Sequence, residues 1–326
     1  LMITVSPLYP LKFYPILKQK VWGGTKLQKR FQKKAKGNIG ESWEISGVEE
    51  NISEIANGPL KGKTLNWVLQ SYREKLVGEA VYKNFGNQFP LLFKFIDAHE
   101  DLSVQVHPDD LLAKARHGSF GKTEMWYILD VEENGKLIIG FNQQMDSKKY
   151  LQYLSKNRIT EILNVETIKK GDAFILKPGT VHAIGAGVLL AEIQQTSDIT
   201  YRIYDWNRPD TDGQPRELHT ELALEAINFG PSKSKLDYSE EINSPSPIGT
   251  TNFFAVNKLV LSKNYLKNLE EVPSFTVYMC LEGSAIIETD DYSEEIKKGE
   301  TVLIPAQLPE LKFITNSASF LEVYIP

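Results

Sequence analysis

Polar residues that could hold a metal ion appear first in the segment from position 101 to 110. Apolar residues at 102, 104 and 106 alternate with polar ones, and this period of two is typical of a strand. It places Ser103, Gln105 and His107 together on the opposite face. Nitrogen and oxygen ligands on one strand face, followed by a Pro-Asp-Asp turn, indicate half of a metal site.

Candidates for the other half of the site lie further along the chain. Glu124 heads a strand after the turn at Gly121, and His182 follows Gly179. Inward positions of neighbouring antiparallel strands face one cavity, so these residues can converge with Gln105 and His107. Catalytic zinc takes three or more such ligands with one position open. We therefore predict a metal site, and a mixed histidine and carboxylate set could also hold Fe(II).

The elements that must position these residues are mostly short strands. The apolar run 89–98 predicts a strand that carries one cation, Lys94, which needs either a partner or access to the surface. Segments 125–129 and 137–141 predict a hairpin around an Asn-Gly turn. Helical spacing or capping predicts three helices, over 65–84, 147–155 and 217–227.

An internal repeat predicts the architecture. Residues 168–178 resemble residues 296–305, and each copy reads as a strand, a turn with glycine and an acid, and a second strand ending at proline. Two all-β units of one kind follow, and many short strands favour a jelly roll. Only the first copy has a histidine four residues after its proline; the second has Pro309. The second unit is thus expected to lack metal ligands.

Bulk composition limits the possible partners. With 326 residues, 41% hydrophobic, 24% charged and a net charge of -5, the chain is expected to be globular and unsuited to broad nucleic-acid binding. No stretch approaches the length of a membrane span, which favours a cytoplasmic protein. The single cysteine, Cys280, cannot form an intrachain disulfide and is expected in the core. The basic segment 26–36 is either a solvated face or a phosphate-steering patch.

Four separated motifs then carry a resemblance to a known family. They are Ser-Val-Gln-Val-His-Pro-Asp from 103, Gly-Lys-Thr-Glu from 121, Pro-Gly-Thr-Val-His-Ala from 178 and Ser-Asp-Ile-Thr-Tyr-Arg from 197. In this order they resemble a type I mannose-6-phosphate isomerase of the short bacterial form. The resemblance covers nearly the whole chain.

The resemblance implies a fold and a metal. The fold is mainly β, with two cupin-type jelly-roll barrels and a few helices inserted in and after the first. The expected boundaries are a catalytic cupin domain over 2–231, a linker over 232–249 and a C-terminal cupin-like domain over 250–326. The family is zinc-dependent, which implies one zinc per chain bound by Gln105, His107, Glu124 and His182.

The activity implied is interconversion of mannose 6-phosphate and fructose 6-phosphate by proton transfer through a cis-enediol. Arg202 would be the catalytic-site arginine, suited to oxyanions because its guanidinium stays protonated. The expected catalytic group also includes Lys122, Glu192 and Asp198. Lys94, Ser103 and Arg202 are expected to bind substrate. Thr123 stands where the longer family members have a proline after the lysine.

Two other functions remain open on the sequence alone. One is a cupin that binds sugar without catalysis, and the other is an iron-dependent cupin oxygenase. The expected partner is a small sugar phosphate, with no nucleic acid, no membrane and no obligatory protein partner.

Overall fold

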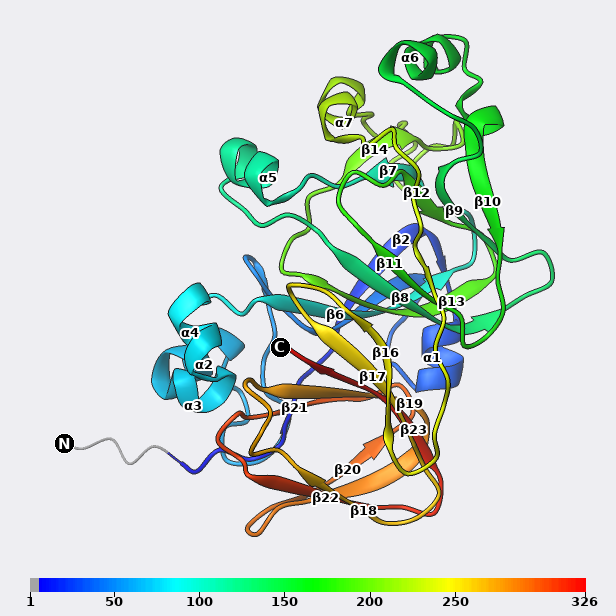
Figure 1. Cartoon of the computed structure of the whole chain (residues 1–326). Helices are drawn as coiled ribbons and strands as arrows, with labels where there is room; N and C mark the ends of the chain where they lie inside the picture. Colours follow the sequence, from blue (N-terminus) through cyan, green and yellow to red (C-terminus); the bar gives the residue numbers. More distant parts are fainter. Residues whose placement is uncertain (1–5) are drawn as a thin grey trace.

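The computed structural model describes residues 6–326, so positions 2–5 of the expected first domain lie outside it. Two β units stack on one another, with the first above the second in Figure 1. Helices α5, α6 and α7 lie at the far end of the first unit, and helices α2 to α4 lie beside the junction. The prediction of a mainly β cupin-type fold with a few helices is confirmed.

The first unit contains two main sheets. The seven-stranded sheet has the order β15 (Lys235–Leu236), β11 (Ala173–Leu176), β8 (Glu124–Val131), β13 (Val188–Gln195), β6 (Leu91–Ala98), β2 (Ile16–Gly24) and β3 (Ile39–Ile45), and β6 also pairs with β3. The five-stranded sheet has the order β10 (Leu163–Thr167), β9 (Lys136–Phe141), β12 (His182–Ile184), β7 (Val104–Val106) and β14 (Tyr201–Tyr204). A small pair, β4 (Gly47–Val48) and β5 (Asn51–Ile52), lies apart.

The second unit is one nine-stranded sheet. Its main order is β1 (Leu11–Lys12), β21 (Thr301–Ile304), β19 (Thr276–Glu288), β23 (Ala318–Tyr324), β17 (Ala255–Leu261) and β16 (Pro245–Thr250). Off this path, β20 (Ser293–Lys297) and β22 (Glu310–Ile314) pair with β19, and β18 (Tyr265–Asn268) pairs with β22. In neither unit do the sheets close into barrels, which corrects the expected jelly-roll barrels. Long strands such as β19 bend from one group of strands to the next instead.

The helices are short. They are α1 (Lys26–Phe31), α2 (Leu65–Tyr72), α3 (Glu74–Val77), α4 (Glu79–Phe85), α5 (Asp110–His117), α6 (Ser147–Ser155) and α7 (Thr220–Ala226), with a 3-10 turn at Ile159–Ile162. The helix expected over 65–84 is broken twice, because Arg73 has φ 51° and Gly78 has φ 95°. Neither value continues a right-handed helix. No helix within residues 6–326 is long and apolar enough to cross a membrane.

The hairpin expected around Asn134-Gly135 is wrong. β8 and β9 are joined by this turn, but β8 pairs with β11 and β13, whereas β9 pairs with β10 and β12. Asn134 adopts φ 69° as a turn residue can. The turn therefore carries the chain from one sheet to the other, and a local turn signal does not determine which strands pair.

The repeat recognised in the sequence forms the same turn twice. Gly171 and Gly299 both have positive φ, at 90° and 81°. The Asp172 carboxylate accepts from the backbone N–H of Lys169 at 3.0 Å, and Glu300 accepts from that of Lys297 at 2.8 Å. Each glycine is needed because the left-handed conformation disfavours a Cβ.

A short edge strand from outside the body of each unit completes its sheet. β15, from the segment expected to be a linker, pairs with β11 of the first unit, and β1, near the start of the chain, pairs with β21 of the second. Lys235 forms an ion pair with Asp172 at 2.9 Å, and Lys12 forms the equivalent pair with Glu300 at 2.9 Å. Each edge strand is thus fixed by the same contact to the repeated turn.

One hydrophobic core spans both units. The largest cluster of buried apolar residues takes members from β6 and β8 of the first unit and from β19 and β23 of the second. Phe89 and Phe275 pack across the junction with ring centroids 4.8 Å apart. Cys280 is buried in the second unit, as expected.

Candidate metal centre and active site

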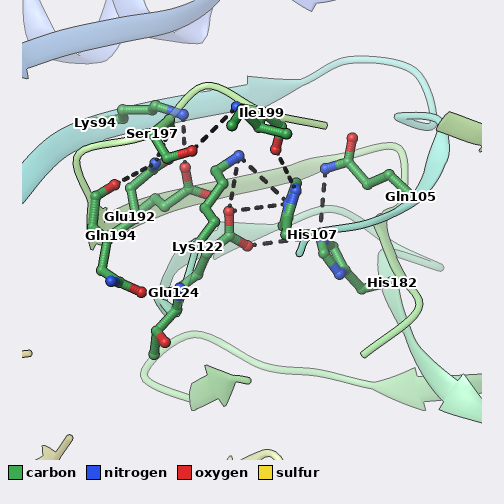
Figure 2. A network of polar contacts seen from close by, with 12 residues as sticks. Lys94, Gln105, His107, Lys122, Glu124, His182, Glu192, Gln194, Ser197 and Ile199 are labelled. Atoms are coloured by element: carbon green, nitrogen blue, oxygen red, sulfur yellow. Dashed lines mark hydrogen bonds and ion pairs between the residues drawn. The ribbon is translucent and has the colours of Figure 1, made fainter. Parts of the chain in front are cut away.

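Three of the predicted ligands meet at one point in the first unit. His107 directly follows β7, Glu124 opens β8 and His182 opens β12. His107 Nε2 lies 3.3 Å from Glu124 Oε1, and His182 Nε2 lies 3.6 Å from Glu124 Oε2. Figure 2 shows the two imidazole rings facing the carboxylate from different strands. All three side chains are buried.

Backbone carbonyls fix the orientation of both rings. His107 Nδ1–H donates to the carbonyl oxygen of Ile199 at 2.9 Å, and His182 Nδ1–H donates to that of Thr180 at 2.8 Å. A carbonyl oxygen only accepts, so the hydrogen of each neutral ring is on Nδ1. The lone pair on each Nε2 therefore points toward Glu124. Burial, and then the neighbouring Lys122, lower the pKa of His107 to about 3.

The Glu124 carboxylate is charged despite its burial. Burial alone would raise its pKa, but the ammonium of Lys122 holds the pKa of Glu124 well below its usual range. Lys122 Nζ lies 3.2 Å from Glu124 Oε1 and 3.4 Å from His107 Nε2. Glu124 Oε2 is buried and has no hydrogen-bond partner among residues 6–326.

This geometry fits a metal ion. The ligand atoms of His107, Glu124 and His182 all lie within 4.8 Å of one another. Tetrahedral zinc with ligand bonds near 2.1 Å places its ligands roughly 3.4 Å apart, close to the two separations from Glu124. An orphaned buried carboxylate oxygen beside two imidazole lone pairs is the donor set that a divalent cation of this kind needs.

Gln105 is also at the centre, in a different orientation from the one a ligand requires. Its amide Nε2 lies 3.4 Å from His182 Nε2, and β7 and β12 place the two residues directly opposite. A ligand would have to present Oε1, and a rotation of the amide would exchange the two atoms.

Next to this cluster is a buried ion pair. Lys94 Nζ lies 2.9 Å from Glu192 Oε1, and Trp126 Nε1–H donates to Glu192 Oε2 at 2.8 Å. Burial opposes the charge of Lys94, but Glu192 and Glu41 together raise its pKa. Burial and the nearby Glu124 raise the pKa of Glu192. Lys94 thus has a carboxylate partner in the core and does not reach for the surface.

The metal cluster opens into a cavity of about 380 Å³. Of the residues proposed from the sequence, Lys94, Ser103, Gln105, Lys122, Glu124, Glu192, Asp198 and Arg202 line it. The lining includes six cations, Lys18, Lys20, Lys94, Lys122, Arg202 and Arg216, and four carboxylates, Glu41, Glu124, Glu192 and Asp198. The chain is acidic overall, at a net charge of -5, so this excess of cations is local to the cavity.

Arg202 lies on β14 directly opposite Gln105 of β7. Its Nη1–H donates to the carbonyl oxygen of Glu217 at 2.9 Å, while its Nε is buried without a hydrogen-bond partner in the described part of the chain. Burial and the nearby Arg216 lower the pKa of Arg202. His219 supports the strand, because its Nδ1 accepts from the Arg202 backbone N–H at 3.0 Å.

Several lining residues were not found from the sequence. Lys18 and Lys20 come from β2, Glu41 and Trp43 come from β3, and Arg216 follows β14. The alternation of Lys18 and Lys20 on one strand was the only local signal. The basic segment 26–36 does not line the cavity; its Lys26, Arg30 and Lys33 are paired with carboxylates.

Strand registers show which residues of the second unit correspond to the site. In the first unit, Phe174 is opposite Trp126, which is opposite Glu192. In the second unit, Val302 is opposite Tyr278, which is opposite Glu322.

Glu322 thus corresponds to Glu192, and it is also buried and held by donors. The Tyr278 hydroxyl donates to it at 2.7 Å and Asn257 Nδ2 donates at 2.9 Å. By the same register Thr276 takes the place of Glu124, because each is opposite the last residue of the repeated strand. A hydroxyl replaces the carboxylate. In residues 6–326, the only group of three His, Cys, Asp or Glu side chains close enough together to hold one metal ion is the one in the first unit.

The cupin-type fold, with a buried His, Glu, His cluster beside a cationic cavity, places the chain among cupins with a site that could bind a metal. Comparison with known proteins makes this more specific. Residues 11–142 match the family model "Phosphomannose isomerase type I, catalytic domain", and residues 248–324 match "Mannose-6-phosphate isomerase, cupin domain".

Relatives match over the whole chain. The mannose-6-phosphate isomerase ManA of Bacillus subtilis is 35% identical over 315 residues, which cover 95% of this chain and 96% of that protein. The mannose-6-phosphate isomerase of Streptococcus mutans is 31% identical, with coverage of 93% and 95%. A crystal structure of the mannose 6-phosphate isomerase from Bacillus subtilis superposes with a TM-score of 0.88 at 34% identity, covering 98% of this chain and all of that one. The chain belongs to the type I phosphomannose isomerase family and is an enzyme.

Proposed function

We propose that the chain interconverts mannose 6-phosphate and fructose 6-phosphate, with one zinc ion per chain, by proton transfer through a cis-enediol. The observation that carries the proposal is the His107, Glu124 and His182 cluster at the end of a cavity with more cations than carboxylates. Such a cavity suits a sugar that carries a phosphate dianion. Family membership supports the same reaction.

Zinc is the metal proposed because the donor set is two imidazole nitrogens and a carboxylate, with Gln105 as a fourth candidate ligand. When bound, the ion would polarise the sugar oxygens and stabilise the negative charge that develops on them. Lys122 and Arg202 are proposed to add fixed positive charge at the same end of the cavity. Lys122 is already in contact with Glu124 and His107.

The proton between the two sugar carbons needs a base with a free lone pair facing the cavity. Glu192 is less suited, since both of its oxygens already accept hydrogen bonds. The Asp198 side chain is exposed at the cavity wall. We therefore assign the base to Asp198, with Glu192 holding Lys94 in place toward the substrate. Ser103, buried in the cavity wall, is proposed to contact the sugar.

The assignment of the base is tested by isotope exchange. Asp198→Asn should abolish incorporation of solvent deuterium into the sugar while leaving metal content unchanged. Glu192→Gln should retain slow exchange. Exchange at the wild-type rate in Asp198→Asn would reject Asp198 as the base.

The metal and the reaction are tested together. Protein purified without added metal should contain one zinc per chain, and a coupled assay with mannose 6-phosphate should show turnover that a chelator removes and zinc restores. His182→Ala should lose both metal and rate. His99→Ala, an exposed histidine outside the cavity, is the matched control. Iron in place of zinc with oxygen consumption, or a His182→Ala variant with full metal and rate, would overturn the proposal.

We also propose a division of labour along the chain. Residues 2–231 would carry the catalytic site, residues 232–249 would connect, and residues 250–326 would form a unit without metal ligands that supports the first through the shared core. Removal of residues 250–326 should therefore prevent stable folding, and a folded truncated chain would contradict this role. The phosphorylated substrate, which does not cross a bilayer unaided, favours action in the cytoplasm.

A further inference from the structure

A line of paired residues, three of which line the cavity, runs across the large sheet of the first unit, away from the candidate metal site. Trp126 of β8 is opposite Glu192 of β13, Glu192 is opposite Lys94 of β6, and Lys94 is opposite Trp43 of β3. Ile16 of β2 follows in the same line. Lys18 lies two residues further along β2 and so on the same face. The line therefore connects the metal end of the cavity to Lys18.

Lys18 is far from the metal centre by this path. At this level β3 lies between β6 and β2, so four strand spacings separate β8 from β2. This is a backbone distance of about 19 Å along the sheet, which the curl of the sheet and the long lysine side chain shorten. A hexose 6-phosphate also has two separated ends, because its reacting carbons and its phosphate lie at opposite ends of the sugar. A phosphate held at the far end would leave C1 and C2 at the metal.

Three of the five other cations of the cavity already have close carboxylate partners. Lys94 is bonded to Glu192, Lys122 contacts Glu124, and Arg216 Nη2 contacts Asp205 Oδ1 at 2.6 Å. Arg202, opposite Gln105, lies at the metal end. These groups are positioned to act on the reacting end of the sugar or to hold the fold.

Lys18 is different. Its ammonium contacts the amide oxygen of Asn51 and lies 4.8 Å from the centre of the Trp43 ring. Within residues 6–326 it has no carboxylate oxygen within 4.0 Å. Lys20, on the same strand face, reaches Glu41 only at 3.8 Å. Burial and the charge of Lys20 lower the pKa of Lys18, while Glu41 and Asp198 oppose this shift. A bound anion would further relieve the repulsion between the two lysines.

We infer that Lys18, with Lys20 beside it and Asn51 orienting its ammonium, binds the phosphate group of the substrate at the end of the cavity opposite the metal. The inference rests on the proposed function. Lysine binds phosphate as a point charge with three donors, and the Trp43 ring keeps the aliphatic stem and the ammonium in place. Lys18 is thus a specificity-determining residue, which selects a phosphorylated sugar over the free sugar.

The test uses the zinc-loaded full chain and compares Lys18→Met with Lys18→Arg. In Lys18→Met we expect the KM for mannose 6-phosphate to rise at least tenfold while kcat stays within about twofold. The inhibition constant of inorganic phosphate should rise by a similar factor. Lys18→Arg should restore most of both. Lys297→Met, an exposed strand lysine of the second unit, is the matched control and should behave as wild type.

The outcomes separate the inference from the function on which it rests. If the wild-type chain shows no turnover of mannose 6-phosphate, the proposed function is wrong. Calorimetric binding of inorganic phosphate to the wild type and to Lys18→Met would then still test the role of Lys18. Turnover in the wild type, with KM and phosphate inhibition unchanged in Lys18→Met, would overturn the inference alone. If Lys18→Met does not fold, Lys20→Met gives the second measurement, and it should raise KM in the same direction.

Discussion

A buried lysine at the junction of the two units should lower the stability of the protein at neutral pH. Lys258 of β17 is 6% exposed, and its Nζ donates to the hydroxyl of Tyr127 of β8 at 2.9 Å. No carboxylate oxygen lies within 4.0 Å of it in the described residues. Burial lowers the pKa of Lys258 from 10.5 to about 8. We predict that Lys258→Met stabilises the protein at pH 7.

The magnitude follows from proton linkage. Between pH 8 and 10.5 the unfolded chain binds more protons than the folded protein, so stability rises with pH across this window. The difference in pKa corresponds to about 3 kcal/mol of destabilisation below pH 8. The methionine removes this cost but also removes the hydrogen bond to Tyr127, worth about 1 kcal/mol. The net gain at pH 7 is about 2 kcal/mol and should vanish near pH 9.5.

Urea unfolding at pH 7 and pH 9.5, followed by tryptophan fluorescence, measures the effect. Lys263→Met, an exposed lysine of the same unit, is the control and should change stability by less than about 0.5 kcal/mol at either pH. A Lys258→Met variant that is less stable than wild type at pH 7, or a gain that is the same at both pH values, would refute the reasoning.

Two further predictions concern the repeated turn and the buried ion pair. Gly171→Ala should cost about 1 to 2 kcal/mol of stability, from positive φ alone, because the atom nearest to its new Cβ is 3.7 Å away. Gly299→Ala should cost about 1 to 3 kcal/mol more, since its Cβ would lie 2.3 Å from the Phe31 Cβ. Equal losses of stability in thermal unfolding would contradict this packing argument. Trp126→Phe removes the indole donor to Glu192 and should lower kcat about tenfold with little change in metal content, and steady-state kinetics with unaltered kcat would show that this hydrogen bond does not matter for the reaction.

The clustering of His107, Glu124 and His182 could be predicted from the sequence because each residue lies next to a local signal. His107 ends a strand with clear alternation, and Glu124 and His182 each follow a glycine turn. The strand around Lys94 was also predictable from its apolar run, and its partner Glu192 was already a candidate by type. The structure brings His107, Glu124 and His182 to one point, where they form a cluster that could bind a metal.

What could not be predicted depends on pairing between distant segments. Lys18 and Trp43 enter the cavity only because β2 and β3 join the large sheet beside β6. The Asn134-Gly135 turn is formed as expected, yet its two strands go to different sheets, because burial on each side outweighs a local hairpin preference. In the segment 65–84, Arg73 and Gly78 interrupt an otherwise regular helical pattern, and packing against the junction favours three short helices.

The pairing of β1 with β21 affects the order in which the chain can fold during synthesis. β1 is synthesised nearly 300 residues before its partner β21, so it cannot join its sheet until β21 has been made. Contacts of such long separation form slowly, and until then β21 presents an open edge on which other chains could pair. The edge strand of the first unit is available sooner, since β15 follows soon after the other strands of that sheet. The last step of folding is therefore expected to be the docking of β1 onto β21, which would cover that edge of the second unit and join segments far apart in the sequence within one sheet.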